Sequence, residues 1–200
     1  DVVTFDNYYR FDIPKKSGGT RHIAAPKIQL KMAQRQILEK ILQKVEVSDV
    51  AHGFIKSKSV LTGAKVHRTS PDLLINMDLE NFFPTITFER VRGLYQHLGY
   101  SGYIASLLAM ICTYCERIPV EIKGETKYIK TSERILPQGS PASPMITNII
   151  CHRMDKRIYG LCQKLGVTYT RYADDMSFSY TGELDKFAIG SFLNSIQKII

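Results

Sequence analysis

The sequence predicts an α+β domain built from short hairpins and amphipathic helices. Its 200 residues are 44% hydrophobic, which is enough to bury one sizeable core. Apolar residues recur at helical spacing in several segments, and strand-like runs are joined by tight Gly- and Pro-containing turns. We find no repeats, low-complexity tracts or obvious linker, so a single domain is expected.

The first half of the chain contains strand-like and helical segments in turn. Two strands are expected at 8–13 and 20–25, joined by the turn PKKSGG. The segment IQLKMAQRQILEKILQKV has helical spacing, and a basic, glycine-containing loop then leads to a short helix. The run LLINM predicts a strand over 73–77, with Asp78 near its carboxyl end.

The second half follows the same rules. Ser101 is a plausible N-cap, PVEIKGETKYIK indicates a hairpin turning at Gly124, and Gly166 is expected to end a long helix. Helices are expected over 88–98, over 101–114, from just after LPQGSPASP to about Leu165, and over 185–200.

Charge and composition limit the partners. The net charge of +8 favours a polyanion such as nucleic acid or a lipid surface. No apolar run approaches the ~20 residues needed to cross a bilayer, and no signal peptide opens the chain, so we expect a cytoplasmic protein without a membrane partner. The missing initiator methionine suggests a piece of a longer protein. The four cysteines are expected to be buried free thiols in a reducing cytosol: Cys112, Cys115, Cys151 and Cys162.

An acidic hairpin tip is the strongest chemical signal. In TRYADDMSFSYTG, Asp174 and Asp175 stand between two strand-like runs, and Asp78 supplies a third carboxylate at a strand end. Turn aspartates usually just face water, but three brought together would repel unless a cation lay among them. Mg²⁺ prefers such oxygen ligands, and two ions about 3.5–4 Å apart can activate an attacking oxygen and stabilise the leaving one.

Three motifs carry a family resemblance. YADD (172–175), DLENFF (78–83) and LPQGSPASP (136–144) occur in the order and spacing of reverse transcriptase palm motifs. The chain resembles a reverse transcriptase and, within that superfamily, the bacterial retron and defence-associated branch. The stretches IPKKSGGTRHIAAP, AHGF and TRYADDMSFS support the resemblance, which covers about 8–200.

The resemblance implies a right-hand polymerase fold with fingers and palm, an antiparallel palm sheet and flanking helices. Residues 1–72 would form a fingers-like region and 73–200 the palm, with fingers helices inserted at about 87–117. The thumb would be absent and the domain truncated at its C-terminus. We therefore expect this piece to fold but to extend primers poorly.

The resemblance also implies the catalytic and metal-binding groups. Asp78, Asp174 and Asp175 would be catalytic and would bind two Mg²⁺ ions together with the backbone carbonyl of Leu79. Mn²⁺ would be a substitute. Nucleotide binding would fall to Lys15, Lys16, Arg21, Phe83, Gln138 and Gly139. Phe83 would exclude a 2′-hydroxyl. Further basic residues would follow nucleic-acid phosphates: Lys27, Lys56, Lys58, Lys65 and Arg68.

The implied function is RNA-directed DNA synthesis, from dNTPs, on the 3′-hydroxyl of a DNA or RNA primer paired to an RNA template. A retron or anti-phage defence system is the expected setting, with a non-coding RNA and an effector protein as further partners. Group II intron-type reverse transcriptase or maturase is the alternative within the family. An RNA-dependent RNA polymerase, a nucleotide cyclase and a non-catalytic RNA-binding scaffold are alternatives outside it.

Overall fold

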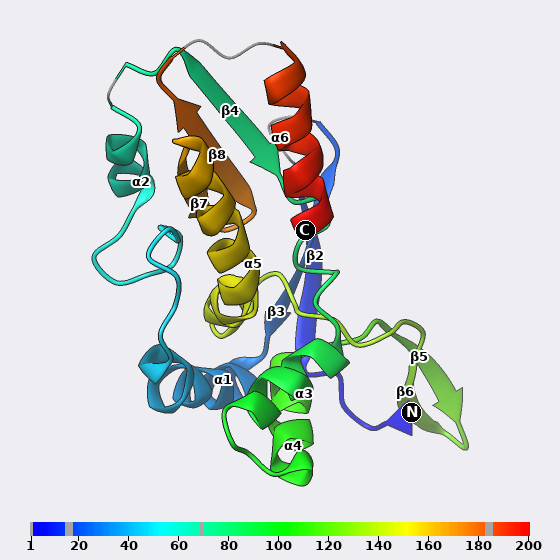
Figure 1. The fold of residues 1–200 in the computed structure, drawn as a ribbon. Coiled ribbons are helices and arrows are strands. Elements are labelled where there is room, and N and C mark those ends of the chain that lie inside the picture. Colours follow the sequence, from blue (N-terminus) through cyan, green and yellow to red (C-terminus); the bar gives the residue numbers. More distant parts are fainter. Residues whose placement is uncertain (1, 15–17, 69, 183–185) are drawn as a thin grey trace. The chain divides into compact units, whose positions relative to one another are not determined.

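The computed structural model describes residues 2–14, 18–68, 70–182 and 186–200 (Figure 1). Helices combine with antiparallel sheets, which confirms the predicted α+β class. The chain divides into two compact units. The first unit comprises Asp1–Val45 and Asn81–Ile146, and the second comprises Glu46–Glu80 and Thr147–Ile200.

The first unit contains a hairpin, a small sheet and a group of helices. Strands β2 and β3 form the hairpin, β1 and β5 both pair with β6, and α4 packs against α1 and α3. The short strand β1 was not predicted from the sequence. The element bounds are β1 Val2–Val3, β2 Tyr8–Pro14, β3 Thr20–Pro26, α1 Ile28–Lys40, η1 Leu42–Lys44, α3 Phe88–His97, α4 Gly102–Cys112, β5 Arg117–Ile122 and β6 Glu125–Lys130.

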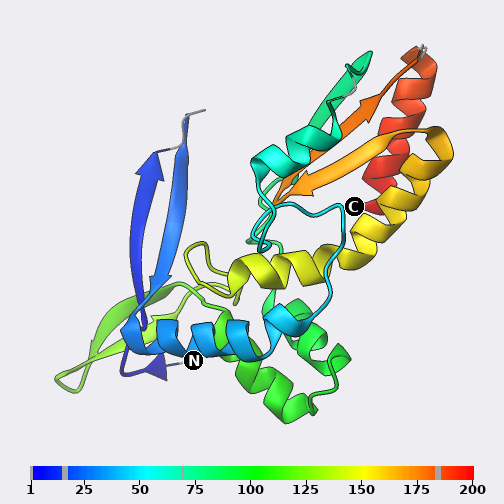
Figure 2. The ribbon, with the colours of Figure 1, turned by 90° about the vertical axis from the view of Figure 1, so that its left-hand side faces the viewer.

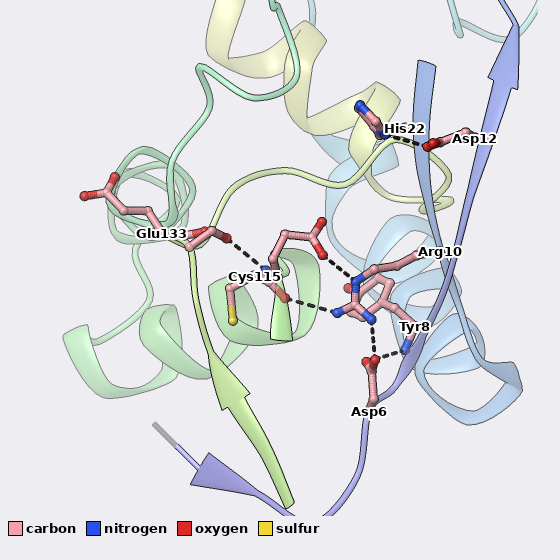
Figure 3. Close-up of polar contacts among 9 residues, drawn as sticks. Asp6, Tyr8, Arg10, Asp12, His22, Cys115 and Glu133 are labelled. Carbon is pink, nitrogen blue, oxygen red and sulfur yellow. Dashed lines mark hydrogen bonds and ion pairs between the residues drawn. The ribbon is translucent and has the colours of Figure 1, made fainter. Parts of the chain in front are cut away.

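A polar cluster around Arg10 fixes the start of this hairpin. Figure 3 shows the Arg10 guanidinium beside Asp6 and the backbone carbonyl of Cys115. Its Nε also lies 2.7 Å from a carboxylate oxygen of Glu116. The other oxygen of Asp6 accepts from the Tyr8 amide at 3.1 Å. One side chain of β2 therefore connects the preceding loop to the segment that enters β5.

The second unit is a sheet covered by helices. Its strand order is β4-β8-β7, and every pairing is antiparallel. Figure 2 shows α5 and α6 along one side of this sheet. Buried residues from both helices and from the strands form the core, among them Ile158, Cys162, Met176, Phe178, Phe192 and Ile196. The bounds are α2 Val60–Val66, β4 Leu73–Asp78, α5 Ser143–Leu165, β7 Thr168–Tyr172, β8 Asp175–Tyr180 and α6 Lys186–Ile199.

Element ends follow the capping and turn residues read from the sequence. The Ser101 hydroxyl accepts from the Ile104 amide at 3.4 Å, at the start of α4. Gly166 ends α5 with a φ of 67°, and Gly124 turns the β5–β6 hairpin with a φ of 78°. Such left-handed backbone is least costly for glycine.

Two further predictions concern composition. All four cysteines are buried and unbridged. In the part of the chain that the structure describes, no helix has both the length and the apolar character that a bilayer crossing requires.

Candidate active site

The acidic hairpin tip forms where the sequence placed it. Tyr172 pairs with Asp175, so Ala173 and Asp174 make the connection between β7 and β8. Ala173 has a φ of 58°, a left-handed conformation that is uncommon for a residue with a side chain. Strand β4 pairs antiparallel with β8 in a register that sets Asp78 opposite Asp175. Directly opposed residues on antiparallel strands project to the same face, so these two carboxylates are neighbours.

Leu79 attaches the end of β4 to this turn. Its amide donates to the backbone carbonyl of Asp174 at 3.1 Å. The four residues predicted to bind metal are therefore brought to one end of a single sheet: Asp78, Leu79, Asp174 and Asp175.

The carboxylates interact electrostatically. Partial burial raises the pKa of Asp175, and the negative charges of Asp174 and Asp78 raise it further. A cation would relieve this repulsion, and the donor set of carboxylate and carbonyl oxygens has the chemistry that Mg²⁺ prefers. Among the described residues, however, no three His, Cys, Asp or Glu side chains are gathered closely enough to form a metal site. The donor chemistry fits the ion, and the metal assignment stays a prediction.

A buried network that the sequence reasoning missed supports the turn. The fully buried Arg171 donates from Nε and Nη2 to the two carboxylate oxygens of Asp155, at 2.8 and 2.7 Å. Its Nη1 donates to Asn148 Oδ1 at 3.2 Å and to the carbonyl of Ala173 at 2.8 Å. Burial alone would lower the pKa of Arg171, but the hydrogen bonds to Asp155 and its charge outweigh burial and raise it. The sequence signal was an arginine inside a strand that is otherwise buried.

The AHGF segment lies against the same turn. Asn148 Nδ2 donates to the Gly53 carbonyl at 2.8 Å, and the His52 amide donates to the Arg171 carbonyl at 2.7 Å. A Cβ on Gly53 would lie 2.7 Å from the amide nitrogen of Ala173. Only glycine permits this approach, which gives the motif a local structural reason.

Gln138 and Gly139 belong to the first unit and lie against β3. The Gln138 carbonyl accepts from the Ala24 amide at 2.9 Å. Gly139 has a φ of 125°, and a Cβ there would lie 3.0 Å from the Ala24 carbonyl oxygen. The following Ser140 hydroxyl donates to the fully buried Gln34 side chain at 2.8 Å. Within the described chain, the buried Oε1 of Gln138 has no hydrogen-bond partner.

The other predicted nucleotide residues are placed as follows. Phe82 is buried, whereas Phe83 is half-buried and meets it edge-on, with ring centroids 5.7 Å apart. Arg21 is exposed on β3, opposite Ile13. Lys15 and Lys16 lie outside the described residues.

The basic residues predicted to contact nucleic acid have differing surroundings. The Lys58 ammonium donates to the backbone carbonyls of Asp49 and Ala51 at 2.6 and 3.1 Å, so its hydrogen bonds are made within the protein. Lys27 lies over the Tyr9 ring, 5.3 Å from its centroid. The remaining three are exposed: Lys56, Lys65 and Arg68.

Comparison with known proteins decides the family. Residues 13–199 match the sequence model of the family described as reverse transcriptase (RNA-dependent DNA polymerase). The chain belongs to the reverse transcriptase family. This match spans all three palm motifs and confirms the resemblance drawn from them.

Curated relatives of this reverse transcriptase domain are retron enzymes. The chain is 41% identical over 181 residues to the retron Mx162 reverse transcriptase and 44% over 173 residues to the retron Mx65 reverse transcriptase, both of Myxococcus xanthus. It is 36% identical over 181 residues to the retron Ec86 reverse transcriptase of Escherichia coli. These matches cover 90%, 86% and 89% of this chain, but only 37%, 40% and 51% of the relatives. The chain therefore spans about half the length of these relatives or less.

Solved structures support the fold. Telomerase from Candida albicans, solved with a fragment of telomeric RNA, gives a TM-score of 0.59 at 10% identity and covers 99% of this chain and 42% of that one. Apo telomerase from Candida tropicalis gives 0.57 at 14% identity, covering 99% and 48%. At such low identity the likeness shows the polymerase-type fold alone.

Proposed function

We propose that this chain is part of an RNA-directed DNA polymerase that joins deoxynucleotides to a primer 3′-hydroxyl on an RNA template. The observation that carries the proposal is the placement of Asp78, Asp174 and Asp175 at the same end of the β4-β8-β7 sheet, in a chain of the reverse transcriptase family. Their register, the raised pKa of Asp175 and the oxygen-only donor set support a divalent-cation role.

The roles of the second unit follow from its contacts. Asp78 and Asp174 would hold Mg²⁺ with the Leu79 carbonyl, and Asp175 would complete the acidic set. When bound, two such ions would lower the pKa of the primer hydroxyl and neutralise charge on the phosphates. The hydrogen bond between the Leu79 amide and the Asp174 carbonyl holds the end of β4 against the turn. It therefore limits how far Asp78 can move relative to Asp174.

The roles of the first unit rest on the family motifs, residue by residue. Arg21, with Lys15 and Lys16, would contact the triphosphate, because a guanidinium forms paired hydrogen bonds with phosphate oxygens. Phe83 would exclude the 2′-hydroxyl, and its half-buried ring is consistent with a contact role. Gln138 and Gly139 would lie beside the nucleotide. The unpaired Oε1 of Gln138 supports that role.

The wider setting is also part of the proposal. Because the curated relatives named above are retron reverse transcriptases, we propose a retron or anti-phage defence role, with a non-coding RNA as template and an effector protein as partner. We assign residues 1–72 to the fingers and 73–200 to the palm, with fingers helices at about 87–117.

Replacing Asp174 with Asn tests the proposal in primer extension by the protein at its natural full length. An RNA template with a DNA primer, Mg²⁺ and dNTPs or rNTPs are supplied. The wild type should extend with dNTPs, and Asp174→Asn should lose extension by ~10²-fold or more because an amide cannot supply the charge that binds the ion.

Asp49→Asn is the matched control, since Asp49 is an exposed aspartate of the same unit. It should retain wild-type extension. Extension by Asp174→Asn at the wild-type rate would refute the catalytic assignment, and preferential use of rNTPs would favour the RNA polymerase alternative.

A further inference from the structure

We infer that Arg171 and Asn148 are positioning residues that hold the Ala173–Asp174 turn in the geometry needed for metal binding. The inference rests on the proposed function and extends it to two side chains outside the acidic set. Both residues are completely buried, and both belong to the second unit together with all of their partners.

The Arg171 guanidinium is itself fixed before it contacts the turn. Two of its nitrogens donate to Asp155 on α5, where that carboxylate also accepts from the Tyr169 hydroxyl at 2.9 Å. The planar guanidinium is thus held in one orientation, and this orientation aims Nη1 at the Ala173 carbonyl, 2.8 Å away. Asp155 on α5 therefore restricts, through Arg171, the orientation of the peptide that precedes Asp174.

The turn needs such support. Ala173 adopts a φ of 58°, which costs free energy for a residue with a Cβ. The Ala173 carbonyl belongs to the peptide bond that leads into Asp174, so a bond to this oxygen restricts the orientation of that peptide. Without it the turn could relax toward a less strained backbone, and the Asp174 carboxylate would move.

Asn148 connects Arg171 to the segment that packs against the turn. Its Oδ1 accepts from Arg171 Nη1, and its Nδ2 donates to the Gly53 carbonyl. Gly53 packs so closely against the Ala173 amide that a Cβ would lie 2.7 Å away. The Asn148 side chain therefore links Arg171, which bonds the Ala173 carbonyl, to Gly53, which packs against the Ala173 amide.

Stability alone does not explain this arrangement. Buried ion pairs contribute little net stability compared with well-packed apolar residues, and they are best attested where they specify one conformation. Here the partners that are not ion-paired, the Asn148 amide and the Ala173 carbonyl, both lead to the aspartate turn. Misplacing a reacting group by about 1 Å can cost ~10²-fold in rate.

Two variants loosen the turn in different ways. Arg171→Lys keeps the charge beside Asp155 but cannot reach the same set of acceptors with one ammonium. Asn148→Ala keeps the Arg171–Asp155 pair and the Arg171 bond to the Ala173 carbonyl, but it removes both Asn148 hydrogen bonds, to Arg171 and to Gly53. Arg134→Lys is the matched control: Arg134 also donates to several groups, among them the carbonyls of Met110 and Thr113, but it belongs to the first unit.

The protein at its natural full length is compared in primer extension, across a range of Mg²⁺ concentrations and well below the unfolding temperature. Arg171→Lys and Asn148→Ala should lower extension by ~10–100-fold and raise the Mg²⁺ concentration for half-maximal rate, as outer-shell substitutions do at metal sites. Arg134→Lys should change thermal stability without changing the Mg²⁺ requirement. Unchanged Mg²⁺ dependence in both turn variants would overturn the inference.

A second readout does not depend on activity. Exchange of the Leu79 amide hydrogen, followed by NMR, reports on its bond to the Asp174 carbonyl. This exchange should accelerate in Arg171→Lys and Asn148→Ala, but not in Arg134→Lys. If the wild type did not extend primers, the proposed polymerase function would fail. Faster Leu79 exchange would then still support the positioning role, and equal exchange would refute it.

Discussion

Gly53 shows how one missing side chain allows a backbone segment to pack closely against the acidic turn. Its Cα lies against the Tyr172–Ala173 peptide, where a Cβ would come within 2.7 Å of one backbone atom and 3.3 Å of another. Backbone atoms cannot rotate away as the end of a flexible side chain can. The residue is therefore sensitive to the smallest addition.

Replacing Gly53 with Ala should destabilise the protein by about 1–3 kcal/mol, the usual cost of overpacking. It should also lower primer extension, because the methyl group pushes on the residue next to Asp174. Chemical unfolding by urea measures the first effect, and the primer-extension assay described above measures the second.

Gly160→Ala is the control. This helical glycine of α5 has nothing within 4 Å of the position a Cβ would take. The change should stabilise the protein by roughly 0.5–1 kcal/mol, because Ala favours helix. Wild-type stability in Gly53→Ala would show that the turn can move without cost.

At the scale of elements, helix α2 is attached to the sheet through two histidines. The capping box of Ser59 and Thr62 begins the helix, and Thr62 Oγ1 also lies 2.8 Å from His52 Nδ1. His67, at its C-terminal end, lies with Nδ1 2.6 Å from Ser179 Oγ and Nε2 2.8 Å from Thr170 Oγ1. The helix is thus joined by imidazole rings to the hairpin that carries the aspartates.

These rings should make stability depend on pH. Burial lowers the pKa of His67 below its ordinary 6.5, and burial with the charges of Lys58 and His67 lowers that of His52. The folded chain therefore takes up protons at lower pH than the unfolded chain. Unfolding free energy should be constant above about pH 7 and should fall as pH drops below about 6.5.

Thermal unfolding of the wild type, His67→Gln and His152→Gln at about pH 7.5 and 5.5 checks this expectation. Gln does not titrate, so His67→Gln should lose less stability on acidification than the wild type, although it starts lower. His152 is exposed on α5, and its variant should keep the wild-type decline. An equal decline in His67→Gln would contradict the assignment of the acid sensitivity to this ring.

At the scale of the whole molecule, the excess of positive charge favours binding to polyanions such as nucleic acid. The net charge is +8, and basic side chains such as Lys56, Lys65 and Arg68 are exposed. Contacts between such groups and phosphates release counterions, which makes affinity fall as salt rises.

We therefore expect RNA binding that weakens steeply between about 50 and 200 mM salt, measured by fluorescence anisotropy with a labelled RNA. Replacing Lys56, Lys65 and Arg68 by Gln in one triple variant should flatten the slope of log affinity against log salt concentration. The same change at Lys123, Lys127 and Lys130, on the β5–β6 hairpin, serves as a comparison of equal charge. Equal salt slopes for the two triple variants would contradict a specific role of Lys56, Lys65 and Arg68 in RNA binding.

The features that the sequence alone determined are local ones. The hairpins, the helix ends at Ser101 and Gly166, and the acidic turn all depend on residues within a few positions of one another. Hydrophobic period, caps and turn residues act over such distances, so each could be predicted before the fold was known. The family motifs added predicted roles for the three aspartates.

The tertiary structure alone decided what supports those aspartates. Arg171 contacts Asp155 across 16 positions and Asn148 across 23, while Asn148 reaches Gly53 across 95. A single sequence marks such residues only as charged or polar groups in apolar surroundings, and their partners can lie anywhere else in the chain. A buried polar group must find a partner when the chain closes, because burial without one costs free energy, and only the packed core determines which partner it finds.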